Sequence, residues 1–465
     1  MGDPNAADDA HRPNVVLVHC HDLGQYLGCY GADVESSNLD ELAEDGVRLA
    51  NSFCTAPQCS PSRSSMMTGA YPHENGVMGL AHMGWALDDD WMTLPKHLRE
   101  AGYSTHLLGF QHEVPDEPER LGYDHVDDDT KRALELVDVV DEFFQGRVED
   151  GQHAGEGEPF FVSIGIEEPH RPFRRDYLTE SIYDEPSPET VDGFPFLPDA
   201  PGVLEDTAAL QSLIAETLDP AIGEYRDALA DAGLAEETLF VFTTDHGLAM
   251  PRAKGTCYDP GLETALIYHQ PGRIEDGAVH DDLVSNVDFT PTILDLVGVE
   301  PPTDVAGRSY AGLLVDENEV KKGDETVETT YEPRERIFGE MTWHDRYNPI
   351  RAIRTERYKY VKNFSVLPRV FVPMDVVPTP SGREVHEEFY VEQRPEEELY
   401  DLEADPHERE NLASDRTPYE PASEASDPDP AHLDELERLR NELHEWMEAT
   451  GDPLLEGPVA YPPVE

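Results

Sequence analysis

Short runs of apolar residues, rich in β-branched and aromatic types, recur along the chain and predict buried strands. They are Asn14–His19 (NVVLVH), Thr105–Gly109, Pro159–Ile166 and Thr238–Thr244 (TLFVFTT). Segments with helical periodicity lie between or after them, at Asn38–Asp45, Asp219–Ala232 and Asp288–Val297. Strands that alternate with helices predict an α/β fold, in which a mostly parallel sheet is sandwiched by helices.

After about Gly323 the pattern changes to short strands that we expect to form a second, antiparallel unit. These strands are Arg336–Thr342, Ile350–Asn363 and Glu398–Leu402. An acidic, Pro-rich linker at Ser414–Pro430 precedes a final helix at Leu433–Met447. We therefore predict an α/β domain at 1–323 and a smaller C-terminal α+β subdomain at 324–465, with an antiparallel sheet and a terminal helix.

Acidic residues dominate the composition of the chain. Its 465 residues include 98 Asp and Glu but 34 Lys and Arg, for a formal net charge of −64. Such a surface repels nucleic acid and anionic membranes, so we exclude both as partners. The excess extends along the whole chain and Arg outnumbers Lys, a pattern that suggests a halophile whose charges are screened by concentrated salt. The alternative is an unusually acidic protein of a mesophilic organism.

The sequence predicts neither a targeting segment nor a membrane span. Its start, MGDPNAADDAHRPNVVLV, lacks the basic and apolar regions of a signal peptide. No apolar run approaches the roughly 20 residues that a transmembrane helix needs. The five cysteines are odd in number and irregularly spaced, which argues against a disulfide framework. We therefore expect a cytoplasmic protein.

Polar residues follow two of the predicted strands. His21 and Asp22 follow the first strand, and Asp245 and His246 follow Thr238–Thr244. Because chemistry gathers at the carboxyl ends of parallel strands, we expect a site there. Cys59, in PQCSPSRSSMMTG, lies at the apparent start of a helix, where a thiol serves as a buried hydrophobe, a disulfide partner, a metal ligand or a nucleophile.

Several segments together resemble the sulfatase family of the alkaline-phosphatase superfamily. They are PNVVLVHCHDLG, CSPSRSSMMTGAYPHENGV, EEPHRPF, TTDHG and ELYDLEADPHERENLA, which span most of the chain. The C-S-P-S-R core followed by M-T-G is highly specific, whereas D-H-G alone is weak. The resemblance implies an alkaline-phosphatase-like fold. The segment YNPIRAIRTERYKYVKNF most resembles the heparan N-sulfatase-like branch of the family. This resemblance implies that the substrate is a small sulfated or sulfamated sugar.

The resemblance implies that Cys59 is converted after translation into formylglycine (3-oxoalanine), and that a formylglycine-generating enzyme is a partner. In the family, one hydroxyl of the hydrated aldehyde attacks the sulfur of a sulfate ester. The second hydroxyl then drives elimination, which releases sulfate and regenerates the aldehyde. The alternative is that Cys59 is a buried, inert thiol.

The family also binds one divalent cation beside this nucleophile. Carried over, the ligands are His21, Asp22, Cys59, Asp245 and His246. The ion that the family favours is Ca²⁺, with Mn²⁺ or Mg²⁺ as alternatives. The family usually has Asp in the place of His21, and a nitrogen ligand fits Mn²⁺ or another transition ion better than Ca²⁺. Alternatively, His21 only borders the site.

Other residues match the catalytic positions of the family. Arg63 is expected to orient the aldehyde hydrate, and Lys254, in RAKGTCYD, to bind the sulfate oxygens. His170, in EEPHRPF, is expected to contact sulfate and to protonate the leaving group as general acid. His112, in GFQHE, is expected to abstract the proton that drives elimination.

The segment around His112 departs from the family, because Phe110 stands where the family has Lys. A neighbouring residue, such as His82 or His21, is a candidate for the missing cation. His82, His344 and Arg354 are further candidates for binding the substrate. Ordinary packing or solvation is the alternative for these three.

The leading hypothesis is a formylglycine-dependent hydrolase of sulfuric esters or sulfamates. The first alternative is a phosphodiesterase or phosphonate monoester hydrolase of the same superfamily. The second is a non-catalytic relative that binds polyanions, which the departures at His21 and Phe110 favour and the intact CSPSR core opposes.

The acidic composition makes stability depend on salt. In dilute buffer the like charges repel one another, whereas at about 1 M salt the screening length falls to about 3 Å. We expect the chain to unfold or lose activity when salt is diluted from molar to ordinary levels. Thermal melting at both concentrations checks this, and an unchanged melting temperature would contradict the halophile interpretation.

Overall fold

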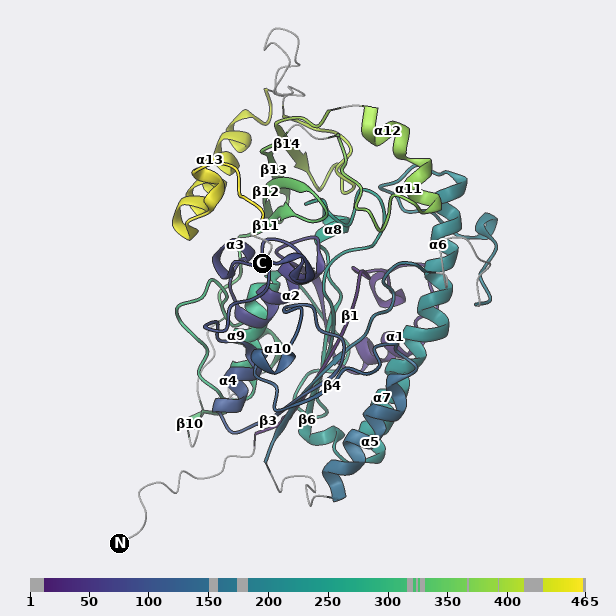
Figure 1. Ribbon diagram of the computed structural model, residues 1–465, viewed down its shortest axis with the longest axis vertical. Coiled ribbons are helices and arrows are strands. Elements are labelled where there is room, and N and C mark those ends of the chain that lie inside the picture. Colours follow the sequence, from purple (N-terminus) through teal and green to yellow (C-terminus); the bar gives the residue numbers. More distant parts are fainter. Residues whose placement is uncertain are drawn as a thin grey trace.

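The computed structural model describes residues 12–149, 158–173, 183–315, 321–322, 325–326, 331–365, 368–391, 393–413 and 430–462. The chain forms a large α/β part, with the smaller C-terminal sheet stacked on one end of it (Figure 1). The predicted boundary at Gly323 and the linker at 414–429 lie outside the described residues. The division at 323 therefore stays a prediction.

The central sheet has eight strands in the order β4-β3-β5-β1-β6-β7-β2-β8. Their bounds are β1 Asn14–Cys20, β2 Val47–Phe53, β3 Ser104–Gly109, β4 His125–Asp127, β5 Phe160–Gly165, β6 Thr238–Thr244, β7 Leu266–His269 and β8 Ala278–Ser285. Only β7 runs antiparallel to its neighbours in this sheet. The predicted mostly parallel sheet is confirmed, and β1 and β6 are adjacent and in register, with Cys20 opposite Thr244.

Helices cover both faces of this sheet. One layer holds α1 Ser37–Glu44, α5 Leu136–Glu149, α6 Pro201–Leu213 and α7 Asp219–Asp231, and the other holds α2 Cys59–Thr68, α4 Leu94–Glu100, α9 Phe289–Leu296 and α10 Ala311–Leu314 (Figure 1). Alternate residues of β1 serve the two layers: Val16 and Val18 pack into the first core, and Val15 and Leu17 into the second. This double burial explains the unbroken apolar run of β1.

The C-terminal sheet is antiparallel, in the order β11-β12-β13-β14. Its strands are β11 Arg336–Trp343, β12 Tyr347–Thr355, β13 Tyr358–Asn363 and β14 Glu397–Asp401. The single strand predicted at Ile350–Asn363 is wrong, because two strands meet there in a tight turn in which the Tyr358 amide donates to Thr355 Oγ1 at 2.9 Å. That hydroxyl ends the first strand and allows the chain to reverse.

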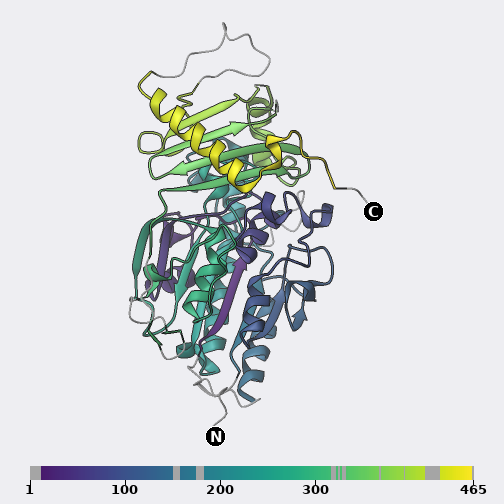
Figure 2. The same cartoon turned by 90° about the vertical axis from the view of Figure 1, so that its left-hand side faces the viewer.

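Two layers hold this sheet in place. Helix α13 (Leu433–Thr450) lies across one face of it, with Leu436, Leu439 and Leu443 packed on the strands (Figure 2). The other face packs against the α/β part through a small core that includes Phe53 and Leu262. Short helices α3 (Pro72–Asn75), α8 (Asp259–Leu262), α11 (Pro380–Glu384) and α12 (His386–Val391) complete the arrangement.

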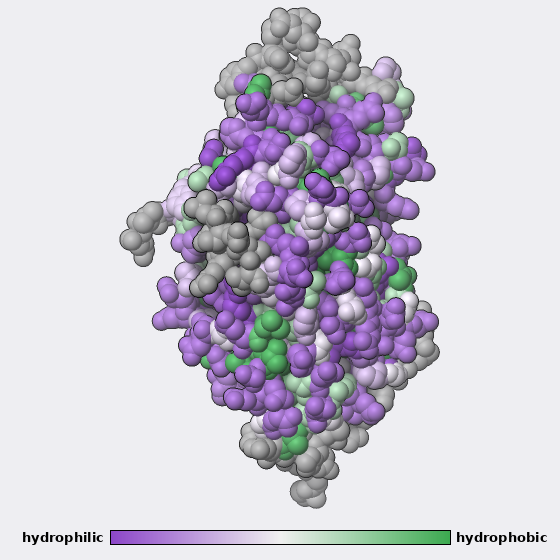
Figure 3. Space-filling view, turned by 90° about the vertical axis from the view of Figure 1, so that its right-hand side faces the viewer, coloured by the Kyte–Doolittle hydropathy of each residue, from purple (hydrophilic) through white to green (hydrophobic). Residues whose placement is uncertain are grey.

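The surface is mainly polar. Hydrophilic residues cover most of the face that bears α6 and α7 (Figure 3). Among the described helices, none combines the length and apolar composition that crossing a bilayer requires.

A buried ion pair joins the C-terminal helix to its sheet. Arg351, on β12, is 0% exposed, and its NH2 nitrogen lies 3.0 Å from Asp452 Oδ1, just after α13. Removing this carboxylate leaves the buried guanidinium with only the more distant Glu340, at 3.7 Å, so we expect Asp452→Ala to lower the free energy of unfolding by about 3 kcal/mol. Denaturant unfolding in high salt measures this. Glu435→Ala, which breaks an exposed pair with Arg438, is the control and should cost about 1 kcal/mol or less.

Candidate active site

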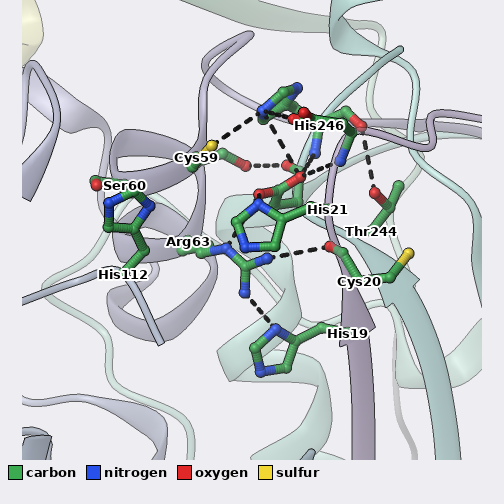
Figure 4. Close-up of polar contacts among 12 residues, drawn as sticks. His19, Cys20, His21, Cys59, Ser60, Arg63, His112, Thr244 and His246 are labelled. Carbon is green, nitrogen blue, oxygen red and sulfur yellow. Dashed lines mark hydrogen bonds and ion pairs between the residues drawn. The ribbon is translucent and has the colours of Figure 1, made fainter. Parts of the chain in front are cut away.

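Three segments meet at the carboxyl ends of β1 and β6. His21 and Asp22 follow β1, Asp245 and His246 follow β6, and Cys59 is the first residue of α2 (Figure 4). Because β1 and β6 are neighbours in register, the two polar pairs lie side by side. The structure therefore brings together all five of the predicted metal ligands.

Asp245 is the most firmly held of these ligands. Its Oδ1 accepts from the backbone amides of Asp22, at 3.0 Å, and His246, at 2.8 Å. Its Oδ2 accepts from Arg63 Nε at 3.1 Å and lies 3.0 Å from His21 Nδ1. Burial alone would raise the pKa of the Asp245 carboxyl, but the charges of His246, Arg63 and His21 lower it far below its ordinary value.

Asp22 has an unusual backbone. Its φ of 53° lies in the left-handed region, where a non-glycine residue costs about 1–3 kcal/mol and is found mainly at functional sites. The conformation places the fully buried carboxylate between His246, with Nε2 2.9 Å from Oδ1, and Lys254, with Nζ 2.9 Å from Oδ2. Although His246 is so close, Asp22 Oδ1 accepts no hydrogen bond within the described residues.

This geometry fits a divalent cation. Side-chain donor atoms of Asp22, Cys59, Asp245 and His246 all lie within 4.8 Å of one another. His246 Nδ1 lies 2.9 Å from the carbonyl oxygen of Gly247, to which it donates, so Nε2 faces the cluster and can bind a metal once its proton has left. Unpaired lone pairs that converge in a buried space are what a cation would satisfy.

Lys254 and His170 flank the same cluster. Lys254 Nζ lies 2.7 Å from Asp375 Oδ2 and 3.4 Å from His170 Nε2. His170 Nδ1 donates to the carbonyl oxygen of Arg171 at 2.6 Å, so its Nε2 faces the site. Burial and Lys254 oppose a charge on His170, but Asp22 and Cys59 together raise its pKa to about 9. His170 is therefore a proton donor at neutral pH.

The thiol of Cys59 is buried, and its Sγ lies 3.5 Å from His246 Nε2. Burial would raise its pKa, but the charge of Lys254 and the nearby imidazoles of His112, His170 and His21 hold the pKa well below the ordinary value. The structure thus surrounds residue 59 with groups that stabilise a negative charge.

Arg63 lies beside the cluster and binds Asp245. Its Nε binds Asp245, its NH2 nitrogen donates to the carbonyl of Cys20 at 3.1 Å, and its NH1 nitrogen binds His19 Nδ1. Within the described residues these partners occupy every nitrogen of the guanidinium. Arg63 therefore supports Asp245, and its expected role at residue 59 stays a prediction.

His112 and His82 form a stacked pair. Their ring centroids are 5.3 Å apart, and His82 Nδ1 lies 3.1 Å from His112 Nε2. His112 Nδ1 is buried and has no hydrogen-bond partner in the described chain. His82 therefore lies next to His112 and sets the direction of its ring.

The two remaining predicted residues differ in their surroundings. His344 lies at the end of β11 with its Nδ1 2.8 Å from Asp345 Oδ1, and its charge acts on Asp375. Arg354 instead binds Asp259 at 3.2 Å and covers the ring of Phe53 at 4.3 Å. The described contacts of Arg354 are those of a buried structural cation, so the structure does not support a role for it in binding substrate.

Asp375 is the residue that the sequence did not reveal. Its carboxylate belongs to the C-terminal part of the chain and pairs with Lys254. The surrounding segment, VFVPMDVVP, carries no motif that points to a site. Only the packing of the two parts of the chain brings it next to Lys254.

Comparison with known proteins decides the family. A family model described as Sulfatase matches residues 13–299, which is more than half of the chain. The chain belongs to the sulfatase family. A second model, described as N-sulphoglucosamine sulphohydrolase, C-terminal, matches residues 247–376 of this sulfatase. The resemblance to the heparan N-sulfatase-like branch is thereby confirmed.

Relatives cover nearly the whole of this sulfatase. It is 26% identical to an ulvan-active sulfatase of Formosa agariphila, over 95% of this chain and 76% of the relative. It is also 26% identical to human N-sulphoglucosamine sulphohydrolase, over 95% of this chain and 91% of the relative.

Solved structures share the fold. One, in complex with its substrate D-glucosamine-2-N,6-O-disulfate, aligns with a TM-score of 0.66 at 19% identity over 95% of this chain and 98% of the other. The phosphonate monoester hydrolase of Agrobacterium radiobacter aligns with the same TM-score of 0.66 and 19% identity, over 97% of this chain and 100% of the other. At this identity, both show the fold alone.

The two departures of this sulfatase touch each other. The rings of His21 and Phe110 meet edge-on, with centroids 4.5 Å apart. The guanidinium of Arg63 and the ammonium of Lys131 approach the Phe110 ring, at 5.6 and 5.4 Å from its centroid. The aromatic ring therefore keeps cations nearby where the family has Lys.

Replacing Asp245 tests whether this sulfatase binds a metal at the predicted site. Asp245→Asn keeps the size of the side chain but removes its charge, so we expect bound divalent metal to fall below half occupancy and hydrolysis to fall by about 100-fold or more. Elemental analysis and sulfate release measure the two effects. Asp295→Asn, at a buried carboxylate on α9, is the matched control. Full metal occupancy in Asp245→Asn would remove this residue from the site.

Proposed function

We propose that this sulfatase hydrolyses a sulfuric ester or sulfamate of a sugar and releases inorganic sulfate, with a formylglycine at position 59 and one divalent cation. The observation that carries the proposal is the position of Cys59. It begins α2 and faces two buried carboxylates, several histidines and Lys254. A nucleophile needs such a setting when it attacks an anionic sulfate.

Asp22, Asp245 and His246, together with an oxygen on residue 59, would hold the cation. When bound, the cation supplies positive charge that both the nucleophilic oxygen and the sulfate share. Ca²⁺ is the ion of first choice, with Mn²⁺ or Mg²⁺ as alternatives. His21, 3.0 Å from Asp245, supports Mn²⁺ if its nitrogen joins the ligands.

Conversion of Cys59 by a formylglycine-generating enzyme would supply an aldehyde hydrate, with one hydroxyl for attack and a second for the release of sulfate. Around it, Lys254 would bind sulfate oxygens through its ammonium, which borders the cluster at Asp22 and Asp375. His170 is placed to protonate the leaving group through Nε2. His112 is placed to accept a proton from residue 59, with its ring directed by His82.

A sulfated sugar is the substrate class that we favour. The match to the C-terminal model of N-sulphoglucosamine sulphohydrolase and the human relative support an N-sulfated amino sugar. The ulvan-active relative supports a sulfated polysaccharide instead. His344 and Asp375 are the residues that we place nearest to the sugar.

Hydrolysis of a phosphonate monoester is the second candidate, because a phosphonate monoester hydrolase shares the fold. Aryl sulfate, N-sulfoglucosamine, phosphate diester and phosphonate monoester, tested as a panel, separate the candidates. We expect the highest kcat/KM for a sulfated substrate. A preference for the phosphonate would favour the alternative, and metal-loaded protein without any turnover would favour a polyanion-binding protein.

Replacing Cys59 is the direct test of the nucleophile. We expect Cys59→Ala and Cys59→Ser to fold and to lose activity by about 1,000-fold or more, because neither side chain offers two oxygens on one carbon. Sulfate release and circular dichroism measure activity and folding. Cys54→Ala, at a buried thiol five positions upstream, is the control for a loss of packing alone. Substantial turnover by Cys59→Ala would contradict the proposal.

The role of His170 predicts a dependence on the leaving group. A basic alkoxide needs a proton as it departs, whereas an activated aryl oxide does not. We therefore expect His170→Gln to lower kcat for a sugar sulfate by about 100-fold or more, and for 4-nitrophenyl sulfate by about tenfold or less. Equal losses on both substrates would assign His170 to the binding of sulfate.

A further inference from the structure

We propose that the chain with Cys59 as an unmodified thiol contains a second metal site, for Zn²⁺, formed by His21, Asp22, Cys59 and His170. Side-chain donor atoms of these four residues all lie within 4.8 Å of one another. This group shares His21, Asp22 and Cys59 with the five predicted ligands described above, but it has His170 in place of Asp245 and His246.

His21 is the residue that points to a ligand. Its side chain is 2% exposed; Nδ1 lies 3.0 Å from Asp245 Oδ2, whereas Nε2 has no hydrogen-bond partner within the described residues. A buried polar group without a partner is costly, and such groups are rare in folded proteins. The ring is held from two sides, by Phe110 at a centroid distance of 4.5 Å and by His170 at 5.3 Å. A metal bound here would satisfy His21 Nε2, which has no partner within the described residues.

The donor set favours zinc over the harder cations. One thiolate, two imidazoles and one carboxylate match the four-coordinate sites of Zn²⁺, with bonds of about 2.0–2.3 Å. Ca²⁺ and Mg²⁺ prefer oxygen ligands and gain little from sulfur. The hydrogen bond from His170 Nδ1 to the carbonyl of Arg171 is the kind of outer contact that orients a histidine ligand.

Lys254 is the charge that opposes the proposed site. Its ammonium lies 2.9 Å from Asp22 Oδ2 and 3.4 Å from His170 Nε2. It also has Asp375, at 2.7 Å, as a second carboxylate partner. When Asp22 binds a metal, Lys254 therefore keeps Asp375 as its carboxylate partner.

The proposed site depends on the sulfur of Cys59. A thiolate binds Zn²⁺ strongly, and the thiol proton leaves to solvent when the metal binds. Conversion of Cys59 to an aldehyde removes the sulfur and, with it, the affinity for zinc. The same four residues would thus bind zinc in the unconverted chain alone, and zinc would cover the position that a substrate must reach.

Cobalt titration of the full, unconverted chain tests the site. Co²⁺ replaces Zn²⁺ in such sites, and its bond to a thiolate gives a charge-transfer absorption band in the near ultraviolet. We expect this band to appear on addition of Co²⁺, to vanish on addition of Zn²⁺, and to be absent in Cys59→Ala. Cys29→Ala, at a half-buried thiol outside the group, should keep it.

Variants of the histidines decide which group binds. We expect His21→Ala and His170→Ala each to weaken Co²⁺ binding by about 10–100-fold, and His246→Asn, whose ring contacts Asp22 and Cys59 but is not among the four ligands, to weaken it less than either. Circular dichroism confirms that each variant is folded. A folded wild-type chain without the band would overturn the proposal, as would a loss in His246→Asn equal to that in His21→Ala. The titration requires neither turnover nor formylglycine, so its failure would leave the proposed hydrolase untouched.

Discussion

Two carboxylates, Asp22 and Asp245, are buried at the ends of neighbouring strands, and the rest of the site keeps them charged. An isolated carboxylate in such a place would take up a proton. Lys254 and His246 compensate Asp22, whereas His246, Arg63 and backbone amides compensate Asp245. Because β1 and β6 are adjacent, the two carboxylates lie close together. The surrounding cations offset the cost of burying their charges.

The need to pair buried charges also determines how the C-terminal sheet attaches to the α/β part. Lys359, fully buried on β13, lies 2.8 Å from Glu408 and also binds Asp259, which begins α8 just after the segment of Lys254. Asp375 reaches Lys254 itself. In a chain with 34 Lys and Arg against 98 acidic residues, many of the cations are thus placed in buried pairs, and the surface is left acidic.

Some elements were predictable because their physical cause is local. The strand expected at Thr238–Thr244 has the observed bounds of β6, since burial on both faces requires an unbroken apolar run. β8 was missed, because its residues Ala278–Asp282 are partly exposed or exposed and include a histidine and two aspartates, so they form no apolar run. α6 was missed as well, since it begins at Pro201, at the end of a Pro-rich stretch.

The candidate site divides in the same way. The candidate ligands after β1 and β6 could be predicted because they lie at strand ends. Cys59 could be predicted because it lies in a specific motif. The partners of Arg63 and the position of Asp375 could not, because they depend on contacts between segments far apart in the chain. The contact of Arg354 was hidden for the same reason: the sequence shows a cation near a strand, but not the buried Asp259 that binds it.

The central claim is that Cys59 acts only after it has lost its sulfur. Peptide mass spectrometry across residues 56–63 of active protein tests this most directly, with the other four cysteines as internal references. The account predicts formylglycine at position 59 and intact thiols at Cys20, Cys29, Cys54 and Cys257. Fully active protein with an unmodified thiol at Cys59 would contradict it.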